Sequence, residues 1–201
     1  MFTVREEPGN MAVLVTGGAR SGKSGFAERL AASRGKSGRY VATSQIYDEE
    51  MEMRAALHRK QRKEQAFSWV TVEEPYELAG LLRQFAQEQG ESALATDVVL
   101  VDCLTLWLSN WLLRYQERQN IVDLVTAKLD ELVKAVEAYQ GHLILVTNEV
   151  GSGIVPEYPL GRQYRDLAGR MNQRLASVCP EVFLVTAGIP VELNSIQWRW
   201  Q

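Results

Sequence analysis

The sequence Val13-Leu14-Val15-Thr16-Gly17-Gly18-Ala19-Arg20-Ser21-Gly22-Lys23-Ser24 decides the fold. A β-branched apolar run passes directly into a glycine-rich segment, and a helical pattern begins at Lys23. This is the GxxxxGKS phosphate-binding loop (P-loop) in its strand–loop–helix setting. Main-chain N–H groups of such a loop turn toward phosphate oxygens, and the following helix presents its positive dipole end to the anion. The stretch therefore predicts a nucleoside triphosphate site.

All loop residues from Gly17 to Ser24 are predicted to contact the nucleotide. Lys23 would reach the β- and γ-phosphates, which makes it a candidate catalytic residue, and the Ser24 hydroxyl would bind Mg²⁺. The alternative is a chance match in a glycine-rich turn. Average residue frequencies put such matches at on the order of one per hundred chains of this length, and the flanking patterns make chance rarer still.

Outward from the loop, short β-branched runs alternate with helical patterns. The predicted strands span residues 12–16, 39–43, 69–73, 97–103, 142–147 and 182–186. The predicted helices span residues 23–34, 49–65, 76–89, 104–115, 122–139 and 161–178, and residues 87–96 read as a polar surface loop. Near-continuous apolar strands between helices indicate an α/β fold of P-loop NTPase type, with a mostly parallel central sheet covered by helices on both faces. Residues 189–193 could add one antiparallel strand.

Composition narrows the class of protein. The chain has 201 residues and a formal net charge of -3, so we expect no nucleic-acid partner. Its longest apolar runs are far short of a membrane span, and the first ten residues lack the apolar core of an export signal. We therefore expect a cytoplasmic protein with a flexible extension over residues 1–10 and a single domain over 11–201. The cysteines, Cys103 and Cys179, read as buried thiols.

An acidic residue beyond a second buried strand should orient Mg²⁺ and its waters. Asp102, which follows the apolar run of residues 98–101, is the candidate. Capping of the helix predicted from Leu104 is the alternative, and both roles could hold together.

His58 is the candidate nucleophile. Arg54 and Arg62 lie four residues on either side of it and share its helical face. Neighbouring positive charge lowers the pKa of a histidine and attracts phosphate, although a surface histidine beside arginines is usually incidental. His142 reads as a strand-end residue, and Glu73 could either accept hydrogen bonds from a ribose or base or cap the next helix.

Six segments together resemble one family. They are GGARSGKS from Gly17, YVATSQ from Tyr40, DEEM from Asp48, the segment 54–62, VTNEVGSGIVPE from Val146 and GRQYRDLAGRMNQRLA from Gly161. They closely resemble the bifunctional adenosylcobinamide kinase/adenosylcobinamide-phosphate guanylyltransferase family of cobalamin biosynthesis. The resemblance spans residues 11–189, and its last two segments fit few other families.

The resemblance implies two reactions. ATP or GTP phosphorylates the aminopropanol hydroxyl of adenosylcobinamide, and GTP then guanylylates a histidine, which passes GMP to adenosylcobinamide phosphate. His58 is the histidine at the family's position. Besides the P-loop, guanosine contacts would fall on Ala42, Thr43, Ser44, Arg59, Lys60, Gln61, Arg62, Glu73 and Asp102. The family often has Glu where this chain has Asp102, and some members have a second histidine beside the nucleophile, which is absent here.

A homotrimer is also implied by the resemblance. Apolar residues such as Trp107, Trp111 and Leu112 could serve an interface between subunits. Packing in the core is the more common use of such residues, and we expect it here.

Asn148 and Glu149 follow a predicted strand at the ligand edge of the sheet, where the second substrate should bind. Helix capping by Asn148 is the alternative. A plain small-molecule kinase without a covalent GMP intermediate is the main rival function. A GTP-dependent switch is disfavoured because the chain has no NKxD element and its DxxG match, residues 166–169, falls within a helical pattern.

Overall fold

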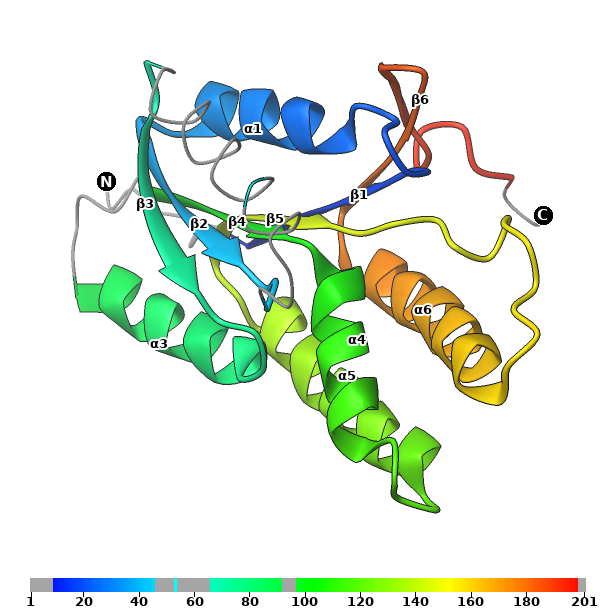
Figure 1. Cartoon of the computed structure of the whole chain (residues 1–201). Helices are drawn as coiled ribbons and strands as arrows, with labels where there is room; N and C mark the ends of the chain where they lie inside the picture. The colour runs from blue at the N-terminus through cyan, green and yellow to red at the C-terminus, as the bar shows by residue number, and fades with distance from the viewer. Residues whose placement is uncertain (1–8, 46–52, 54–65, 92–96, 199–201) are drawn as a thin grey trace, which may run out of the picture.

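The computed structural model describes residues 9–45, 53, 66–91 and 97–198 (Figure 1). They form one seven-stranded sheet in the order β3-β2-β4-β5-β1-β6-β7. The strands are β1 (Asn10–Thr16), β2 (Ser37–Ala42), β3 (Ser68–Glu73), β4 (Asp97–Asp102), β5 (Gly141–Val146), β6 (Glu181–Thr186) and β7 (Ile189–Glu192). All neighbours pair in parallel except β6 and β7, which are antiparallel. The predicted fold class is confirmed, including the antiparallel strand near the C-terminus.

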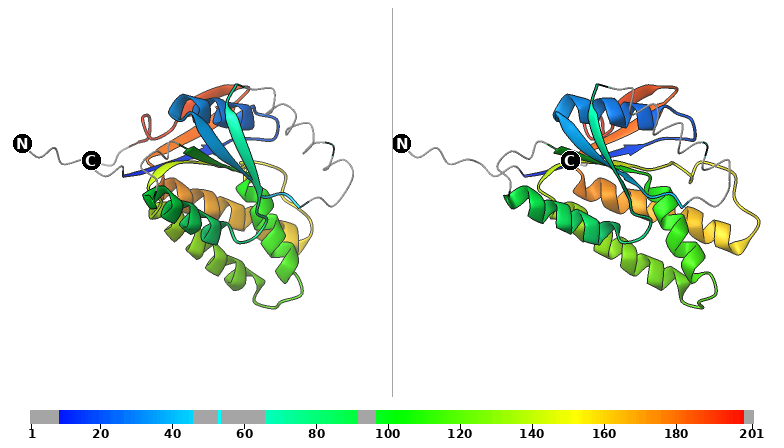
Figure 2. Two further views of the ribbon diagram at one scale, coloured as in Figure 1. Left: turned by 90° about the vertical axis from the view of Figure 1, so that its left-hand side faces the viewer. Right: turned by 60° about the vertical axis from the view of Figure 1, so that its left-hand side comes forward.

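Helices cover both faces of the sheet, as expected. They are α1 (Lys23–Arg34), α3 (Leu78–Glu91), α4 (Leu104–Tyr115), α5 (Ile121–Glu137) and α6 (Pro159–Val178). Figures 1 and 2 show α1 on one face and α3 to α6 on the other. The two-residue period of the strands explains this division, because Val13 and Val15 pack with α1 whereas Ala12 and Leu14 pack in the larger core beneath the other helices.

The tryptophans of α4 belong to this larger core. Trp107, Trp111 and Leu112 are all buried, so the core role is confirmed rather than exposure at an interface. Both indole Nε1 atoms donate to the carbonyl oxygen of Tyr76, at 2.7 and 3.2 Å. Each bulky ring therefore buries its apolar surface without leaving its N–H unpaired.

The loop predicted over residues 87–96 was wrong in its first half, because α3 continues to Glu91. Glutamine and glutamate are good helix formers, and their polarity does not end a helix. Glu88 also forms an ion pair with Arg39 of β2 and accepts a hydrogen bond from Gln84 at 2.9 Å. The helix predicted over residues 49–65 lies almost entirely outside the described residues.

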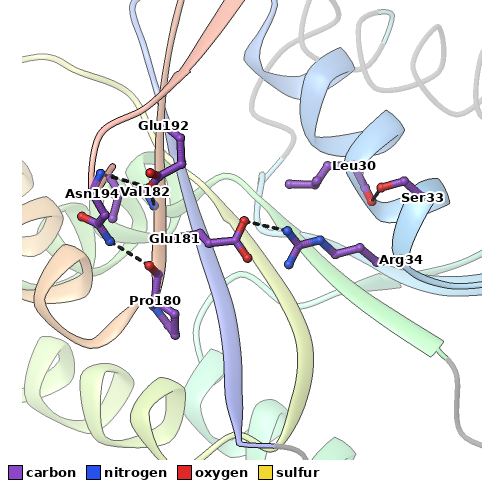
Figure 3. A network of polar contacts seen from close by, with 8 residues as sticks. All are labelled: Leu30, Ser33, Arg34, Pro180, Glu181, Val182, Glu192 and Asn194. Atoms are coloured by element: carbon purple, nitrogen blue, oxygen red, sulfur yellow. Dashed lines mark hydrogen bonds and ion pairs between the residues drawn. The ribbon is translucent and has the colours of Figure 1, made fainter. Parts of the chain in front are cut away.

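The far end of α1 is tied to the start of β6. Figure 3 shows the Arg34 guanidinium donating to the Glu181 carboxylate, at 2.7 Å. Beside it, Glu192 accepts from the main-chain N–H groups of Val182 and Asn194 at 3.3 and 3.0 Å. These contacts hold the antiparallel β6–β7 pair against the helix that follows the P-loop.

Strand register brings the predicted site residues to one edge. Glu73 pairs with Ala42, Ala42 with Asp102, Asp102 with Val146, and Val146 with Val15. Each residue lies at or next to the carboxyl end of its strand. The segments that follow therefore emerge together, at the edge where open α/β sheets bind ligands. None of the helices in the described part of the chain is long and apolar enough to cross a membrane.

Candidate active site

The P-loop is packed tightly against the end of β6. A Cβ atom on Gly17 would overlap the carbonyl oxygen of Val185, so only glycine fits there. Gly188, in the turn after β6, donates its main-chain N–H to the Ser21 carbonyl at 2.8 Å. Gly188 has a φ of 80° and Gly22 a φ of 92°, a left-handed region that favours glycine. The β6–β7 turn thus supports the loop from outside.

Lys23 lies inside the loop and is only 8 % exposed. Its ammonium donates to the Gly18 carbonyl oxygen at 3.1 Å. Burial lowers the pKa of Lys23, and the nearby carboxylate of Asp102 opposes that shift. A partly desolvated ammonium inside an anion-binding loop is well placed to neutralise phosphate charge.

Asp102 closes β4 on the same side of the sheet as Lys23. Its Oδ2 accepts a hydrogen bond from the Tyr40 hydroxyl at 3.0 Å. The helix-capping alternative is not supported, because the N-cap residue of α4 is Cys103 and no side chain caps that helix. Asp102 and the Ser24 hydroxyl offer hard oxygen ligands of the kind Mg²⁺ prefers. Among the described residues no group of three or more His, Cys, Asp or Glu could hold a metal, so phosphates and water would complete the shell.

The segment Ala42 to Ser44 contributes mainly through its backbone and outer residues. Thr43 is buried, and its hydroxyl donates to the Cys103 carbonyl at 2.6 Å while accepting from the Cys103 N–H at 3.0 Å. Its own carbonyl accepts from Asn110 at 2.8 Å. Thr43 therefore joins the ends of β2 and β4, and Ala42 and Ser44 on either side of it are half-buried.

The capping role considered for Glu73 belongs to its neighbour. Glu74 Oε1 accepts from the main-chain N–H groups of Tyr76 and Glu77, at 2.9 and 2.8 Å. Glu73 itself is exposed at the end of β3, at the ligand edge.

Asn148 and Glu149 lie beside the P-loop. The Glu149 N–H donates to the Gly17 carbonyl at 3.1 Å, and Asn148 Nδ2 donates to Thr105 Oγ1 at 2.7 Å. Asn148 caps no described helix, because the next helix begins at Pro159 with Tyr158 as its N-cap residue. Its carbonyl accepts from Asn172 Nδ2 at 3.1 Å. Both residues are thus brought to the triphosphate loop.

Several predicted residues are not brought together here. His58, Arg59, Lys60, Gln61 and Arg62 lie outside the described residues. His142 lies near the start of β5, at the opposite edge of the sheet from the P-loop. Burial and the nearby Arg34 lower the pKa of His142, which fits the structural reading.

Sequence reasoning missed the polar residues behind Asn148. Thr105 lies in the first turn of α4, and Asn172 lies on the inward face of α6 with Tyr164 and Ala168, at spacings of four. Tyr164 donates to the Thr105 carbonyl at 3.3 Å, and burial raises its pKa to about 12. An asparagine on an otherwise apolar helix face was the available signal.

Comparison with known proteins agrees with this geometry. Residues 13–193 match the family model described as cobinamide kinase / cobinamide phosphate guanyltransferase. The chain is 42% identical to the bifunctional adenosylcobalamin biosynthesis protein CobP of Pseudomonas aeruginosa, over 90% of this chain and 96% of that protein. It is 40% and 39% identical to the proteins named CobU of Escherichia coli and Salmonella typhimurium, over 92% of this chain and 100% of each. A solved structure of an ATPase domain is 10% identical with a TM-score of 0.48 over 88% of this chain and 69% of its own, and carries no argument about function.

The match to the family model covers most of the sequence, and the relatives cover nearly all of it at about two-fifths identity. The P-loop, the sheet order and the residues at the carboxyl edge agree with that assignment. This chain therefore belongs to the cobinamide kinase / cobinamide phosphate guanyltransferase family.

Proposed function

We propose that this chain phosphorylates adenosylcobinamide with ATP or GTP and then transfers GMP from GTP to adenosylcobinamide phosphate. The products of the second reaction are adenosyl-GDP-cobinamide and pyrophosphate. The observation that carries the proposal is a complete P-loop, with Lys23 and Asp102 on the same side of the sheet, in a chain that matches the family over residues 13–193.

In the kinase reaction the acceptor hydroxyl attacks the γ-phosphorus and the bond to the β-phosphate oxygen breaks, which releases the nucleoside diphosphate. Lys23 and the loop N–H groups bind the phosphates and offset the charge on the transferred group. Ser24 and Asp102 would hold Mg²⁺, which supplies further charge neutralisation at the phosphates. The nearness of Asp102 to Lys23 supports this pairing of roles.

In the guanylyl transfer we assign the nucleophile to His58, from its place in the family motif. A neutral imidazole nitrogen forms a bond to the α-phosphorus of GTP while pyrophosphate leaves, and a phosphate oxygen of the acceptor then displaces the imidazole. Arg54, Arg59 and Arg62 would offset charge on the transferred group. The nucleotide would also contact Ala42, Thr43, Ser44, Lys60, Gln61, Glu73 and Asp102.

The acceptor end of the site is assigned to Asn148 and Glu149, which stand next to the loop that holds the γ-phosphate. Proximity of the acceptor hydroxyl to that phosphate is the main requirement of the reaction. A homotrimer in the cytoplasm completes the proposal.

A product assay tests the proposed function. Purified protein is incubated with adenosylcobinamide, Mg²⁺ and either ATP or GTP, and the corrinoid products are identified by mass. We expect adenosylcobinamide phosphate with either nucleotide, and adenosyl-GDP-cobinamide only when GTP is present. A phosphorylated product without any GDP adduct under GTP would show a plain kinase instead, and no phosphorylation at all would overturn the proposal.

A further inference from the structure

A buried hydroxyl fixes the side chain of Asn148. Thr105, in the first turn of α4, is 2 % exposed, and its Oγ1 accepts the Asn148 Nδ2 hydrogen bond at 2.7 Å. The same Oγ1 lies 3.2 Å from the Cys103 sulfur. Burial raises the pKa of that thiol to about 11, so the sulfur is neutral at physiological pH. The Thr105 hydroxyl is therefore enclosed between two protein groups and shielded from solvent.

The main chain of Asn148 is held independently. Asn172 of α6 donates Nδ2 to the Asn148 carbonyl at 3.1 Å, and Asn172 Oδ1 accepts from the Thr147 hydroxyl at 2.8 Å. With its backbone held by Asn172 and its NH₂ group by Thr105, the Asn148 carboxamide has one orientation. Its Oδ1 accepts no hydrogen bond from the residues that the structure describes. An amide oxygen in a fixed orientation is a suitable partner for an O–H donor.

The position of this amide is as specific as its orientation. The next residue, Glu149, donates its N–H to the Gly17 carbonyl, so Asn148 is one residue from the P-loop. An alcohol that attacks a γ-phosphate held by Lys23 must approach at this point.

We propose that Thr105 is a positioning residue, which holds the Asn148 carboxamide so that Oδ1 accepts a hydrogen bond from the hydroxyl of the acceptor alcohol. The inference rests on the proposed function, in which Asn148 binds the acceptor. Loss of the Thr105 hydroxyl leaves the amide free to rotate and present NH₂ in place of oxygen. Acceptor binding then weakens, whereas the nucleotide contacts of the P-loop are unaffected.

The test compares the full-length wild type with Thr105→Val, Thr105→Ser, Asn148→Ala and the double variant Thr105→Val/Asn148→Ala. Valine keeps the volume of threonine and removes the hydroxyl, and serine restores it. Ser177→Ala removes an exposed hydroxyl at the distant end of α6, where it bonds to Arg174, and serves as the matched control. For each protein the KM for adenosylcobinamide, the kcat of phosphorylation, the nucleotide Kd and the Tm are measured.

We expect Thr105→Val to raise the acceptor KM roughly tenfold, the size of effect that loss of one hydrogen bond gives. The nucleotide Kd should stay within about twofold, and Thr105→Ser should restore the KM. Because Thr105 acts through Asn148, Thr105→Val should add nothing in the Asn148→Ala background. An unchanged KM in Thr105→Val, a full effect in the Asn148→Ala background, or an equal rise in acceptor KM and nucleotide Kd would each overturn the inference.

Failure of the inference can be told apart from failure of the proposed function. If the wild type does not phosphorylate adenosylcobinamide, the proposed function is wrong and the positioning role has no substrate to act on. If the wild type is active and Asn148→Ala binds the acceptor normally, only the assignment of Asn148 and Thr105 is wrong. Should Thr105→Val fold poorly, the comparison of Thr105→Ser with Asn148→Ala still decides, because serine must retain acceptor binding and alanine must lose it.

Discussion

Lys23 and Asp102 show how burial turns ordinary side chains into tools for phosphate chemistry. The ammonium of Lys23 is held inside the P-loop by a carbonyl oxygen, and its pKa is lowered by burial. The carboxylate of Asp102 is kept in place by the Tyr40 hydroxyl. Neither contact contributes much to the hydrophobic core, so changes at these positions should affect chemistry more than folding.

Lys23→Ala should reduce both phosphoryl and guanylyl transfer by roughly 100-fold or more, because one preorganised cationic donor is lost from the phosphates. The Tm should change little. Steady-state rates for both reactions and a thermal melt check this. Lys134→Ala removes a lysine in the last turn of α5 and should match wild type. Retention of wild-type turnover in Lys23→Ala would contradict the P-loop assignment.

Asp102→Asn should raise the Mg²⁺ concentration needed for half-maximal activity by roughly tenfold, because a neutral amide is a weaker partner for the metal and its waters than a carboxylate. The amide oxygen can still accept the Tyr40 hydrogen bond, so the local structure is kept. A titration of activity against Mg²⁺ measures the effect. Tyr40→Phe, which removes only that hydrogen bond, should shift the titration less, and identical curves for Asp102→Asn and wild type would leave Asp102 without a metal role.

His58→Ala should separate the two reactions, because the imidazole is needed for guanylyl transfer and not for phosphorylation of the alcohol. Wild type incubated with Mg²⁺ and α-labelled GTP should acquire a label that is stable in base and labile in acid, as a phosphoramidate is. The variant should acquire none and still phosphorylate adenosylcobinamide. His142→Ala is the control, because His142 lies at the opposite sheet edge. A label that persists in His58→Ala, or that maps to His142, would show that another residue is the nucleophile.

The helix α6 contains two glycines with opposite demands. A Cβ on Gly161 would lie 2.7 Å from both the Pro156 side chain and the Tyr158 ring, whereas a Cβ on Gly169 would have nothing within 4 Å. Gly161 therefore lets the segment that follows Asn148 fold closely against the helix. Gly169 meets no such constraint and only weakens the helix.

Gly169→Ala should raise the free energy of unfolding by about 0.5–1 kcal/mol, because alanine loses less backbone entropy in a helix than glycine does. Gly161→Ala should lower it, since Pro156 and the Tyr158 ring must move. Chemical denaturation of both variants gives the comparison on one helix. Equal effects of the two substitutions would show that packing at Gly161 is not as close as the structure has it.

The chain as a unit keeps its thiols in a dry interior on both faces of the sheet. Cys103 is buried on the α1 face and Cys179 at the end of α6, and both are free thiols. Burial raises their pKa values to about 11 and about 12, from 9.0. Their reactivity is therefore a measure of the integrity of the whole fold.

Native protein at pH 8.5 should resist alkylation by iodoacetamide, and denatured protein should be labelled at both cysteines. The sign of the linked stability effect follows. Between about pH 9 and pH 11 the unfolded chain loses thiol protons that the native chain retains, so stability falls as the pH rises. Denaturation at pH 8, 9 and 10 measures this, and Cys179→Ala should flatten the decline. Fast labelling of the native protein would contradict the burial of these residues.

Local sequence patterns were enough to predict the P-loop, the alternation of strands and helices, and the polar residues that follow strands at Asp102 and Asn148. Each of these depends on residues that are close together in the chain: a glycine-rich turn, a two-residue or a 3.6-residue period, or a polar residue after an apolar run. The buried position of the Trp107 side chain could also be inferred in this way, because large apolar residues at helical spacing usually face a core.

The strand order, the register that aligns Glu73 with Ala42 and Asp102, and the partners of Asn148 were decided only by the tertiary structure. The contact between Thr105 and Asn148 joins residues 43 positions apart, and no local period encodes which strand lies next to which. The choice of Glu74 over Glu73 as the helix cap also depends on the exact residue at which β3 ends. Such features follow from the free energy of packing the whole sheet, where each contact depends on all the others.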